Sequence, residues 1–399
     1  MKICLITPFY DPWLLGGAEK YAKTLVEELS TIHEFVVITS KGPIPRKQQN
    51  LSHSSYKIIE ITPRNILTLY DVTKKDLTLG FKKYLWHFFD LWNISAYIKI
   101  KNILKEEKPN LVHINGIMGF SPSVFSLLKD LQIPHVLTIH DLSLISRWSS
   151  LFRKGKPVSK LNLLDRMYVS YLRKLSANVV AVMSPSKFAM ELYENLGYFK
   201  NSCKYVIPNG TLLNENTKPK EGPAREFLYV GRISEFKGPQ IVVQAFKKIS
   251  NKNIKLHIAG EGPYLETLRM MAKDDERIIF HGFAQGKVLD EIFTKCSYVI
   301  IPSLGYENSP LVVSQSMNKG LPVIGSNIGG IPELIKDGYD GFLFEPGNVD
   351  SLHHIIEILI NDKEILAKLS TNAIQSSKKF SIESQMKSIL DVYSATFSG

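Results

Sequence analysis

The sequence predicts an α/β protein built from two doubly wound domains, each with a parallel sheet. Three observations support this: the chain has 399 residues, short apolar runs alternate with helical patterns, and the alternation starts again after residue 208. A single core rarely grows beyond about 250–300 residues, so the length favours two domains. The apolar content of 44% and the charged content of 22% are typical of a soluble globular protein.

Each expected strand is a short and nearly continuous apolar run, as strands buried on both faces require. In the first half these runs are residues 2–9, 34–40, 56–62, 110–116, 134–141, 178–184 and 204–210. In the second half they are residues 225–232, 254–262, 277–283, 296–303, 321–327 and 341–347. Helical patterns lie between them at 18–30, 94–107, 187–197, 239–250, 263–273, 286–295 and 310–319. Such alternation predicts parallel strands joined by crossover helices.

The polar segment "NGTLLNENTKPKEGPARE", rich in Pro and Gly, is typical of a linker. We therefore expect a first domain at residues 1–207 and a second at 208–380. A C-terminal helix at 381–399 is expected to pack back on the first domain. The opening "MKICLITPFY" is interpreted as a buried strand and not as a signal peptide, because its apolar run is short and ends at Pro8. No run reaches the roughly 18 apolar residues that a membrane span needs.

Charge is divided unequally along the chain. The net charge is +11. Residues 1–207 hold 28 Lys and Arg against 16 Asp and Glu, which gives +12, and residues 208–399 hold 21 against 22, which gives −1. This excess predicts an anionic partner for the first half: a phosphate, a nucleic acid or a membrane surface. The three cysteines, Cys4, Cys203 and Cys296, are far apart and are expected to be core residues in a reducing cytosol.

In doubly wound sheets, ligands bind outside the carboxyl ends of the strands, so the turns after the strands carry the functional predictions. After the first strand, Gly16 and Gly17 precede a helix whose free N–H groups suit a phosphate; a plain flexible turn is the alternative. After the run 134–141, His140 is expected to donate or accept a hydrogen bond near the substrate. Asp141 either orients that imidazole or caps the next turn.

In the second half, Arg232 and Lys237 flank a loop that ends at Gly238, where two cations can bind a diphosphate or can be solvated surface charges. The loops with Gly260, Gly262 and Gly282 either wall a nucleotide base or form plain turns.

Glu307 opens a strand-to-helix loop, and the peptides near Ser309, Leu311 and Val312 start the helix. Amides that hold a phosphate beside a carboxylate that accepts from hydroxyls suit a phosphorylated sugar. The alternative is that Glu307 only complements the helix dipole.

These motifs resemble the retaining nucleotide-sugar glycosyltransferases of family 4, which have the two-domain GT-B fold with a central cleft. The resemblance runs from "ITPFYDPWLLGGAEK" to "GFLFEPGN" and is most specific in "VGRISEFKG", "IAGEGP" and "PSLGYENSPLVV". It implies a nucleotide-diphosphate sugar as donor, no cofactor and no metal ion. It further implies a hexosyltransferase that acts on a glycan or lipid-linked acceptor, as in cell-surface polysaccharide biosynthesis.

The resemblance also implies residue roles. Gly16, Gly17, Arg232 and Lys237 would bind the donor diphosphate together with the amides of Leu311 and Val312. His140 would meet the transferred sugar near the reacting carbon, and Glu307, with Asn308 and Ser309, would bind its hydroxyls. Gly260, Gly262 and Gly282 would lie near the base.

The chain departs from the family at the second Glu of its E-x7-E element, where Gln315 stands. The family's Glu accepts hydrogen bonds from both ribose hydroxyls, whereas a Gln keeps one carbonyl acceptor and loses the charge. We expect weaker nucleotide binding, by about tenfold, and unchanged chemistry.

Basic and aromatic residues mix at 80–104 and 146–176, which suits an anionic bilayer or a lipid diphosphate; a core helix pair with solvated lysines is the alternative for 80–104. The expected location is cytoplasmic, at the inner face of the membrane. Two rival functions are a nucleotide-sugar epimerase of the same shape and a nucleotide-sugar-binding protein without catalysis. Nucleic-acid binding is disfavoured, because the sequence carries no nucleic-acid module.

Overall fold

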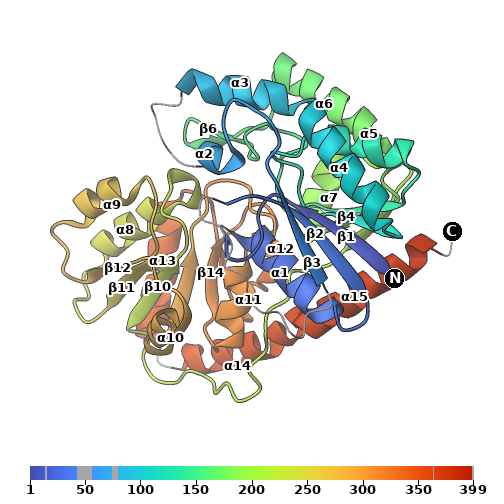
Figure 1. Ribbon diagram of the computed structural model, residues 1–399. Coiled ribbons are helices and arrows are strands. Elements are labelled where there is room, and N and C mark those ends of the chain that lie inside the picture. The colour runs from blue at the N-terminus through green and yellow to red at the C-terminus, as the bar shows by residue number, and fades with distance from the viewer. Residues whose placement is uncertain (14–15, 43–55, 74–79, 363, 398–399) are drawn as a thin grey trace. The chain divides into compact units, whose positions relative to one another are not determined.

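The computed structural model describes residues 1–13, 16–42, 56–73, 80–362 and 364–397, which form two compact units (Figure 1). Unit 1 comprises residues 1–150, 160–207 and 386–399, and unit 2 comprises residues 151–159 and 208–385. The second half of the C-terminal helix α15 (Ile382–Phe397) therefore belongs to unit 1. Within the described residues, no helix has both the length and the apolar character needed to span a membrane.

Unit 1 contains a seven-stranded parallel sheet in the order β3-β2-β1-β4-β5-β8-β9. The strands match the predicted runs and are β1 (Lys2–Thr7), β2 (Glu34–Ser40), β3 (Tyr56–Ile61), β4 (Leu111–Ile114), β5 (His135–Thr138), β8 (Ala181–Ser184) and β9 (Cys203–Val206). The central strands β1, β4 and β5 are almost fully buried, as continuous apolar runs require.

Helices lie between the strands of this sheet, and they include the helices predicted at 18–30, 94–107 and 187–197. They are α1 (Gly17–Leu29), α2 (Leu69–Thr73), α3 (Gly80–Asp90), α4 (Ile94–Glu107), α5 (Ser123–Asp130), α6 (Leu163–Leu175), η2 (Ser176–Asn178) and α7 (Lys187–Asn195). Helices α3 and α6 lie side by side in Figure 1, and the Tyr171 hydroxyl of α6 donates to the Leu91 carbonyl just after α3, at 3.1 Å. The sequence interpretation of 80–104 as a core helix pair fails for α3, because only Trp86 and Asp90 of that helix are buried.

Unit 2 contains a six-stranded parallel sheet in the order β12-β11-β10-β13-β14-β15. The strands are β10 (Glu226–Val230), β11 (Lys255–Ala259), β12 (Ile278–Gly282), β13 (Tyr298–Ile301), β14 (Val323–Ser326) and β15 (Gly341–Phe344). Phe227 and Tyr229 of β10 pack in one core and Leu228 between them packs in the other, so the sheet is buried on both faces.

The helices of unit 2 divide between these two cores. Helices α8 (Pro239–Lys248), α9 (Leu265–Ala272) and α13 (Val349–Asn361) supply the core that holds Phe227. Helices α10 (Gly286–Lys295), α11 (Leu311–Asn318) and α12 (Ile331–Leu334) supply the core that holds Leu228. Helix α14 (Ile365–Ser377) contributes to both, and the short helices η3 (Glu235–Lys237) and η4 (Lys378–Phe380) complete the unit.

Residues 151–159 lie inside the predicted first domain, but they belong to unit 2. They form the antiparallel hairpin of β6 (Phe152–Arg153) and β7 (Lys156–Pro157). The Phe152 ring packs edge to face on Phe236, with 5.4 Å between the ring centroids. The basic side chains of this hairpin, which the sequence analysis placed on the first domain, therefore lie beside the loop that carries Lys237.

Candidate active site

Each sheet reverses its strand order at one point, between β1 and β4 in unit 1 and between β10 and β13 in unit 2. Ligands of doubly wound sheets bind outside the carboxyl ends of the strands at such points. Gly16 follows β1, Lys237 follows β10 and Glu307 follows β13. The sequence-predicted residues therefore cluster at the two positions where the topology favours a ligand.

The centre of the unit 2 site is an ion pair between Lys237 and Glu307. Lys237 Nζ lies 2.6 Å from Glu307 Oε1, and the side chains are 32% and 11% exposed. The Ser303 hydroxyl donates to the same Oε1 at 2.9 Å. Since the described residues hydrogen-bond only Oε1 of this carboxylate, Oε2 is left to accept from a ligand.

Close backbone approach brings the loop of Lys237 onto the loop of Glu307. A Cβ added at Gly238 would lie 1.9 Å from the Pro302 carbonyl oxygen, and the φ of Gly238 is +69°. The amide of Leu304 donates to the Phe236 carbonyl at 2.9 Å. Only glycine fits at position 238, because any side chain would push these two loops apart.

The loop after β14 fixes the backbone of Glu307. The Gly330 amide donates to the Glu307 carbonyl at 2.8 Å. A Cβ at Gly329, whose φ is +62°, would lie 2.4 Å from that carbonyl oxygen. Glu307 is therefore held by three loops, those after β10, β13 and β14.

Helix α11 begins directly after this carboxylate. Pro310 precedes it, and the amides of Leu311 and Val312 are in its first turn, where an α-helix has no internal partners for N–H groups. The Asn209 amide donates to the Ser309 carbonyl at 3.1 Å, which steadies the approach to the helix. Half-buried Gln315 is four residues after Leu311 and shares its helix face.

Glycines stack the loops after β10, β11 and β12 on one another. Cβ atoms added at Gly260 and Gly262 would lie 1.9 Å and 2.2 Å from the carbonyl oxygens of Gly231 and Ile233. The Gly260 amide donates to the Gly282 carbonyl at 2.7 Å. Loop packing therefore accounts for these glycines, and a contact with a base stays a prediction.

Arg232 follows β10, so it lies at the same carboxyl end of the sheet as Lys237, and its side chain is exposed. Its carbonyl accepts from the Tyr229 hydroxyl at 2.8 Å, which fixes the backbone at the start of the loop. No hydrogen bond or ion pair to its guanidinium group comes from the described residues, so this cation is available to an anionic ligand.

In unit 1 the site is built around His140 and Asn115. His140 Nε2 donates to Asn115 Oδ1 at 2.6 Å. The Asn115 amide nitrogen donates to the carbonyl of Ala18 at 3.1 Å and to Thr7 Oγ1 at 3.2 Å. A carbonyl can only accept, so Ala18 fixes which end of the Asn115 amide faces His140.

This contact fixes the tautomer of His140. Because Nε2 carries the proton, Nδ1 has the free lone pair of the neutral ring. Burial lowers the pKa of His140 to about 3, so the ring is neutral at physiological pH. The Tyr21 ring packs edge to face on it, with 4.7 Å between centroids. His140 can therefore accept a hydrogen bond through Nδ1 from a hydroxyl.

Asn115 also joins His140 to the start of α1. Gly16 and Gly17, which precede Ala18, are exposed, and Asn115 is bonded to the Ala18 carbonyl. The Glu19 carboxylate accepts hydrogen bonds from the backbone at Gly16 and at Glu19 itself, while burial raises its pKa. A phosphate at this turn would compete with that carboxylate, and its binding by Gly16 and Gly17 stays a prediction.

Asp141 does not orient the imidazole. Its Oδ1 accepts from the Ser143 amide at 2.9 Å and so caps the following turn. Both roles of Asp141, orienting the imidazole and capping the turn, were compatible with the sequence. In the structure, Asn115 orients the His140 imidazole instead.

A buried polar chain extends from this site to the C-terminal helix. His113 is fully buried; its Nδ1 shares a hydrogen bond of 2.6 Å with the Tyr393 hydroxyl of α15, and its Nε2 shares one of 2.7 Å with Thr138. The hydroxyls of Thr138 and Tyr21 are 3.4 Å apart. Burial lowers the pKa of His113 to about 3, so this ring also stays neutral.

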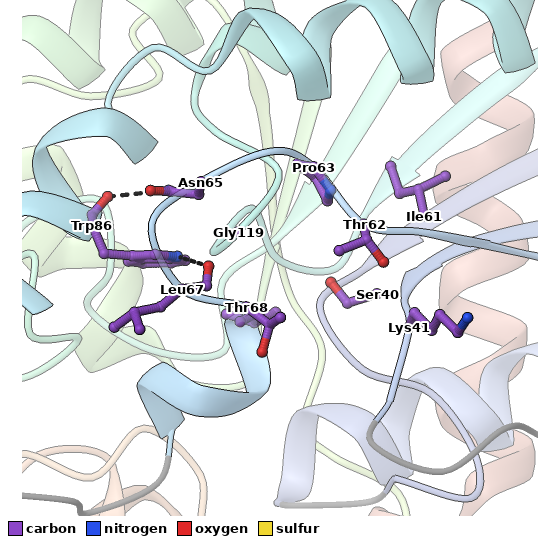
Figure 2. A pocket seen from close by; sticks show the side chains of 11 residues that line it. Ser40, Lys41, Ile61, Thr62, Pro63, Asn65, Leu67, Thr68, Trp86 and Gly119 are labelled. Atoms are coloured by element: carbon purple, nitrogen blue, oxygen red, sulfur yellow. Dashed lines mark hydrogen bonds between the residues drawn. The ribbon is translucent and has the colours of Figure 1, made fainter. Parts of the chain in front are cut away.

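A pocket lies at the carboxyl ends of β2 and β3, between Trp86 on one side and Ser40 and Lys41 on the other (Figure 2). The Trp86 indole donates to the Leu67 carbonyl at 2.9 Å, and the Asn65 amide donates to the Trp86 carbonyl at 3.3 Å. Internal hydrogen bonds therefore occupy the polar groups at the Trp86 end of this pocket, whereas Ser40 Oγ at the other end is buried without a partner among the described residues.

Sequence reasoning missed three residues that position the site: Asn115, Ser303 and Gly329. Asn115 stands at the end of the run 110–116, where an Asn is common because its side chain suits turns. The contact of Ser303 with Glu307 spans four residues of a loop whose conformation no periodic pattern predicts. The Gly-Gly pair at 329–330 was a visible signal, since paired glycines mark close backbone approach.

Two doubly wound sheets with these charged and hydrogen-bonding groups at their switch points define a glycosyltransferase of the GT-B fold. The chain belongs to the glycosyl transferases group 1, which it matches over residues 213–376, and residues 15–214 match glycosyltransferase family 4. It is 32% identical over 400 residues to an uncharacterised glycosyltransferase of Methanocaldococcus jannaschii, and the match covers 98% of each chain.

Two further similarities bear on substrates and fold. The chain is 26% identical over 328 residues to an Escherichia coli UDP-Gal:α-D-GlcNAc-diphosphoundecaprenol α-1,3-galactosyltransferase, covering 75% of this chain and 79% of that one. The structure of Anabaena HepE in complex with UDP superposes with a TM-score of 0.75 at 18% identity, covering 99% of this chain and 100% of that one. The fold class predicted from the sequence is thus confirmed.

Proposed function

We propose that this chain is a retaining hexosyltransferase that moves a sugar from a nucleoside-diphosphate sugar to a glycan or lipid-linked acceptor in cell-surface polysaccharide synthesis. The observation that carries the proposal is the pair of Lys237 and Glu307 at the switch point of unit 2, in front of the first turn of α11. A cation, a carboxylate with a free oxygen and unpaired helix amides are the groups that a sugar diphosphate requires.

Unit 2 binds the donor in this proposal. Lys237 and exposed Arg232 neutralise the diphosphate together with the amides of Leu311 and Val312. Glu307 Oε2, with Asn308 and Ser309, accepts from hydroxyls of the transferred sugar. Gln315 faces the ribose through its amide.

The chemical step exchanges one C–O bond for another on the same face of the sugar. The bond between the anomeric carbon and the phosphate oxygen breaks as the bond to the acceptor oxygen forms. The acceptor's proton passes to the departing phosphate oxygen. The leaving group is then stabilised by fixed cations and amides, and the step needs no metal ion and no other cofactor.

His140 acts on the transferred sugar in this scheme. Its neutral ring offers Nδ1 as an acceptor, so it orients a sugar hydroxyl and does not protonate the leaving group. The hydrogen bond from Nε2 to Asn115 preserves that role.

The acceptor is assigned to unit 1. Two features support a lipid-linked one: a relative is named for a diphosphoundecaprenol-linked substrate, and the surface of α3 and α6 exposes large apolar side chains. Their exposed fractions include 75% for Phe81, 66% for Phe88, 73% for Leu163 and 62% for Met167. With the lysines and arginines of the first half, this surface suits the inner face of an anionic membrane.

A donor screen tests the proposed reaction. The chain is incubated with UDP- and GDP-sugars, and both thermal stabilisation and sugar release are measured. We expect one donor to raise the melting temperature and to be slowly hydrolysed. A donor that binds without release would identify a binding protein, and a donor recovered as its epimer would identify an epimerase.

Flotation with vesicles tests the membrane assignment. Phe81→Ser with Phe88→Ser should reduce salt-sensitive flotation with anionic vesicles. Met270→Ser, which removes a 70% exposed apolar residue from unit 2, serves as the control and should float like the unmodified chain. Equal flotation of all three chains would refute the α3–α6 surface as the membrane contact.

A further inference from the structure

A second pocket of unit 1, here called the Asp90 pocket, lies at the C-terminal end of α3 and is lined by other residues than the pocket of Figure 2. The residues that carry its chemistry are His87, Asp90, Met118, Ser143, Arg147 and Tyr168. The pocket has no role in the donor site described above.

Asp90 is the unusual group of this pocket. The residue is only 9% exposed, and its Oδ2 accepts from the Gly119 amide at 3.0 Å. Its Oδ1 is buried and has no hydrogen-bond partner among the described residues. A buried carboxylate oxygen without a partner is costly, so it indicates a site that a ligand or a water completes.

The surroundings of Asp90 favour a hydroxylated ligand over a cation. Arg147 places a guanidinium group on the pocket. Burial, together with the nearby charge of Arg147, lowers the pKa of His87 to about 4, so His87 is neutral. Tyr168 donates its hydroxyl to the Ser143 carbonyl at 2.8 Å. Among the described residues that line the pocket, Asp90 is the one carboxylate, whereas a metal ion requires several oxygen ligands.

The Asp90 carboxyl itself suits a sugar hydroxyl. Burial raises its pKa to about 7 against the opposing effect of the Gly119 amide, so at pH 8 and above, where the binding test below is made, the carboxylate is ionised and Oδ1 is an acceptor. A hydroxyl that donates to Oδ1 would supply the missing partner. Arg147 can hold a further hydroxyl or an anionic substituent of the same ligand.

The loops that form the pocket are the loops that hold His140. Met118 comes three residues after Asn115, and Ser143 comes three residues after His140. The pocket therefore lies at the same carboxyl edge of the sheet, at β4 and β5, as the group assigned to the transferred sugar.

We propose that the Asp90 pocket binds a sugar ring of the acceptor, with Asp90 Oδ1 accepting from a ring hydroxyl and Arg147 holding a second oxygen. This inference rests on the proposed function, because it names the acceptor as a saccharide. It assigns acceptor recognition to a carboxylate on α3, separate from the donor-binding groups of unit 2.

Asp90→Asn is a sharp test because of the Gly119 amide. The Asn oxygen must face that N–H, which places its NH2 group where Oδ1 was and turns an acceptor into a donor. The fold should keep its melting temperature. Asp130→Asn is the matched control, since the Asp130 carboxylate on α5 also accepts one hydrogen bond, from the Tyr97 hydroxyl.

Binding is measured at pH 8 by saturation-transfer NMR with the p-nitrophenyl glycosides of glucose, galactose and N-acetylglucosamine at millimolar concentration. We expect at least one glycoside to bind the unmodified chain and Asp130→Asn. Its affinity for Asp90→Asn should fall by about tenfold or more. Equal binding to Asp90→Asn, or no binding of any glycoside to the unmodified chain, would overturn the inference.

Donor hydrolysis in the same samples separates this inference from the proposed function. Asp90→Asn should hydrolyse the donor at the unmodified rate. If no donor is hydrolysed or bound by any of the chains, the proposed function fails. If hydrolysis is normal and glycoside binding is unchanged by the substitution, only the Asp90 pocket fails.

Discussion

The candidate sites of the two units are built on opposite electrostatic principles. In unit 2, a lysine and a glutamate form a partly exposed pair at 2.6 Å, with an exposed arginine nearby. In unit 1, His140, Asn115 and His113 are neutral and are held by hydrogen bonds in buried surroundings. The difference matches the proposed roles, because a diphosphate needs charge and a sugar hydroxyl needs a fixed acceptor.

The largest expected effect is at the charged pair. Lys237→Ala removes a fixed cation that stabilises the leaving diphosphate, and Glu307→Gln removes the charged acceptor for the sugar hydroxyls. Each substitution should lower the transfer rate on the order of 100- to 1,000-fold. Glu276→Gln, which neutralises an exposed carboxylate of the same unit, is the control. The measurement is single-turnover transfer with the donor found in the screen. Full activity of Glu307→Gln would remove the main support for the proposed function.

The elements that the sequence predicted well are those with a local signal. The runs 34–40 and 296–303 are short and nearly continuous apolar segments, and they contain the buried strands β2 and β13. Lys237 and Glu307 were both predicted as site residues from the turns in which they stand. Their contact was beyond sequence reasoning, because it depends on Gly238 and Gly329 closing two loops that are far apart along the chain.

The hairpin at 151–159 and the pocket at Asp90 show the other limit. Nothing in "LFRKGKPVS" indicates that its Phe152 packs on Phe236, or that the hairpin belongs to unit 2 and not to unit 1. Asp90 ends a helix rich in aromatics and has the pattern of an ordinary solvated acid. Its burial follows from the packing of the loop of Gly119 around it, which the sequence does not reveal.

The next effect tests the neutral site of unit 1. Asn115→Ala removes the acceptor for His140 Nε2 and the donor to Ala18, so the ring can rotate and change tautomer. We expect kcat to fall by about 10- to 100-fold with an unchanged Kd for the donor nucleotide. Asn178→Ala, an exposed asparagine of the same unit, should behave like the unmodified chain. A loss confined to donor affinity would instead assign Asn115 to nucleotide binding.

The pH dependence of stability tests whether the histidines of unit 1 are buried as neutral rings. The pKa of His113 is about 3 in the folded chain and about 6.5 when unfolded, so only the unfolded chain takes up its proton between these values. The contribution of the neutral His113 ring to the free energy of unfolding is complete above pH 6.5 and is lost as the pH falls toward 3. At pH 5 the loss is about 2 kcal/mol. The melting temperature of His113→Gln should therefore change less between pH 7 and pH 5 than that of the unmodified chain.

The control for this comparison is His354→Gln, because His354 is exposed on α13 of unit 2. It should keep the full pH dependence of the unmodified chain. A His113→Gln chain that loses melting temperature as steeply as the control on acidification would show that His113 is not buried as a neutral ring. If His113→Gln does not fold, the same comparison can be made with His140→Gln, whose pKa is lowered by the same cause.

The smallest expected effect sharpens the comparison within unit 2. Gln315→Glu restores a carboxylate on the helix face of Leu311, where a charged acceptor binds ribose hydroxyls more strongly than an amide does. Nucleotide affinity should rise by about tenfold or less, with kcat nearly unchanged, in a titration of the nucleoside diphosphate by calorimetry. Gln285→Glu, at an exposed position of the same unit, should leave the affinity unchanged. If Gln315→Glu instead binds the nucleoside diphosphate more weakly, position 315 faces the phosphates and not the ribose, because a carboxylate there would repel them.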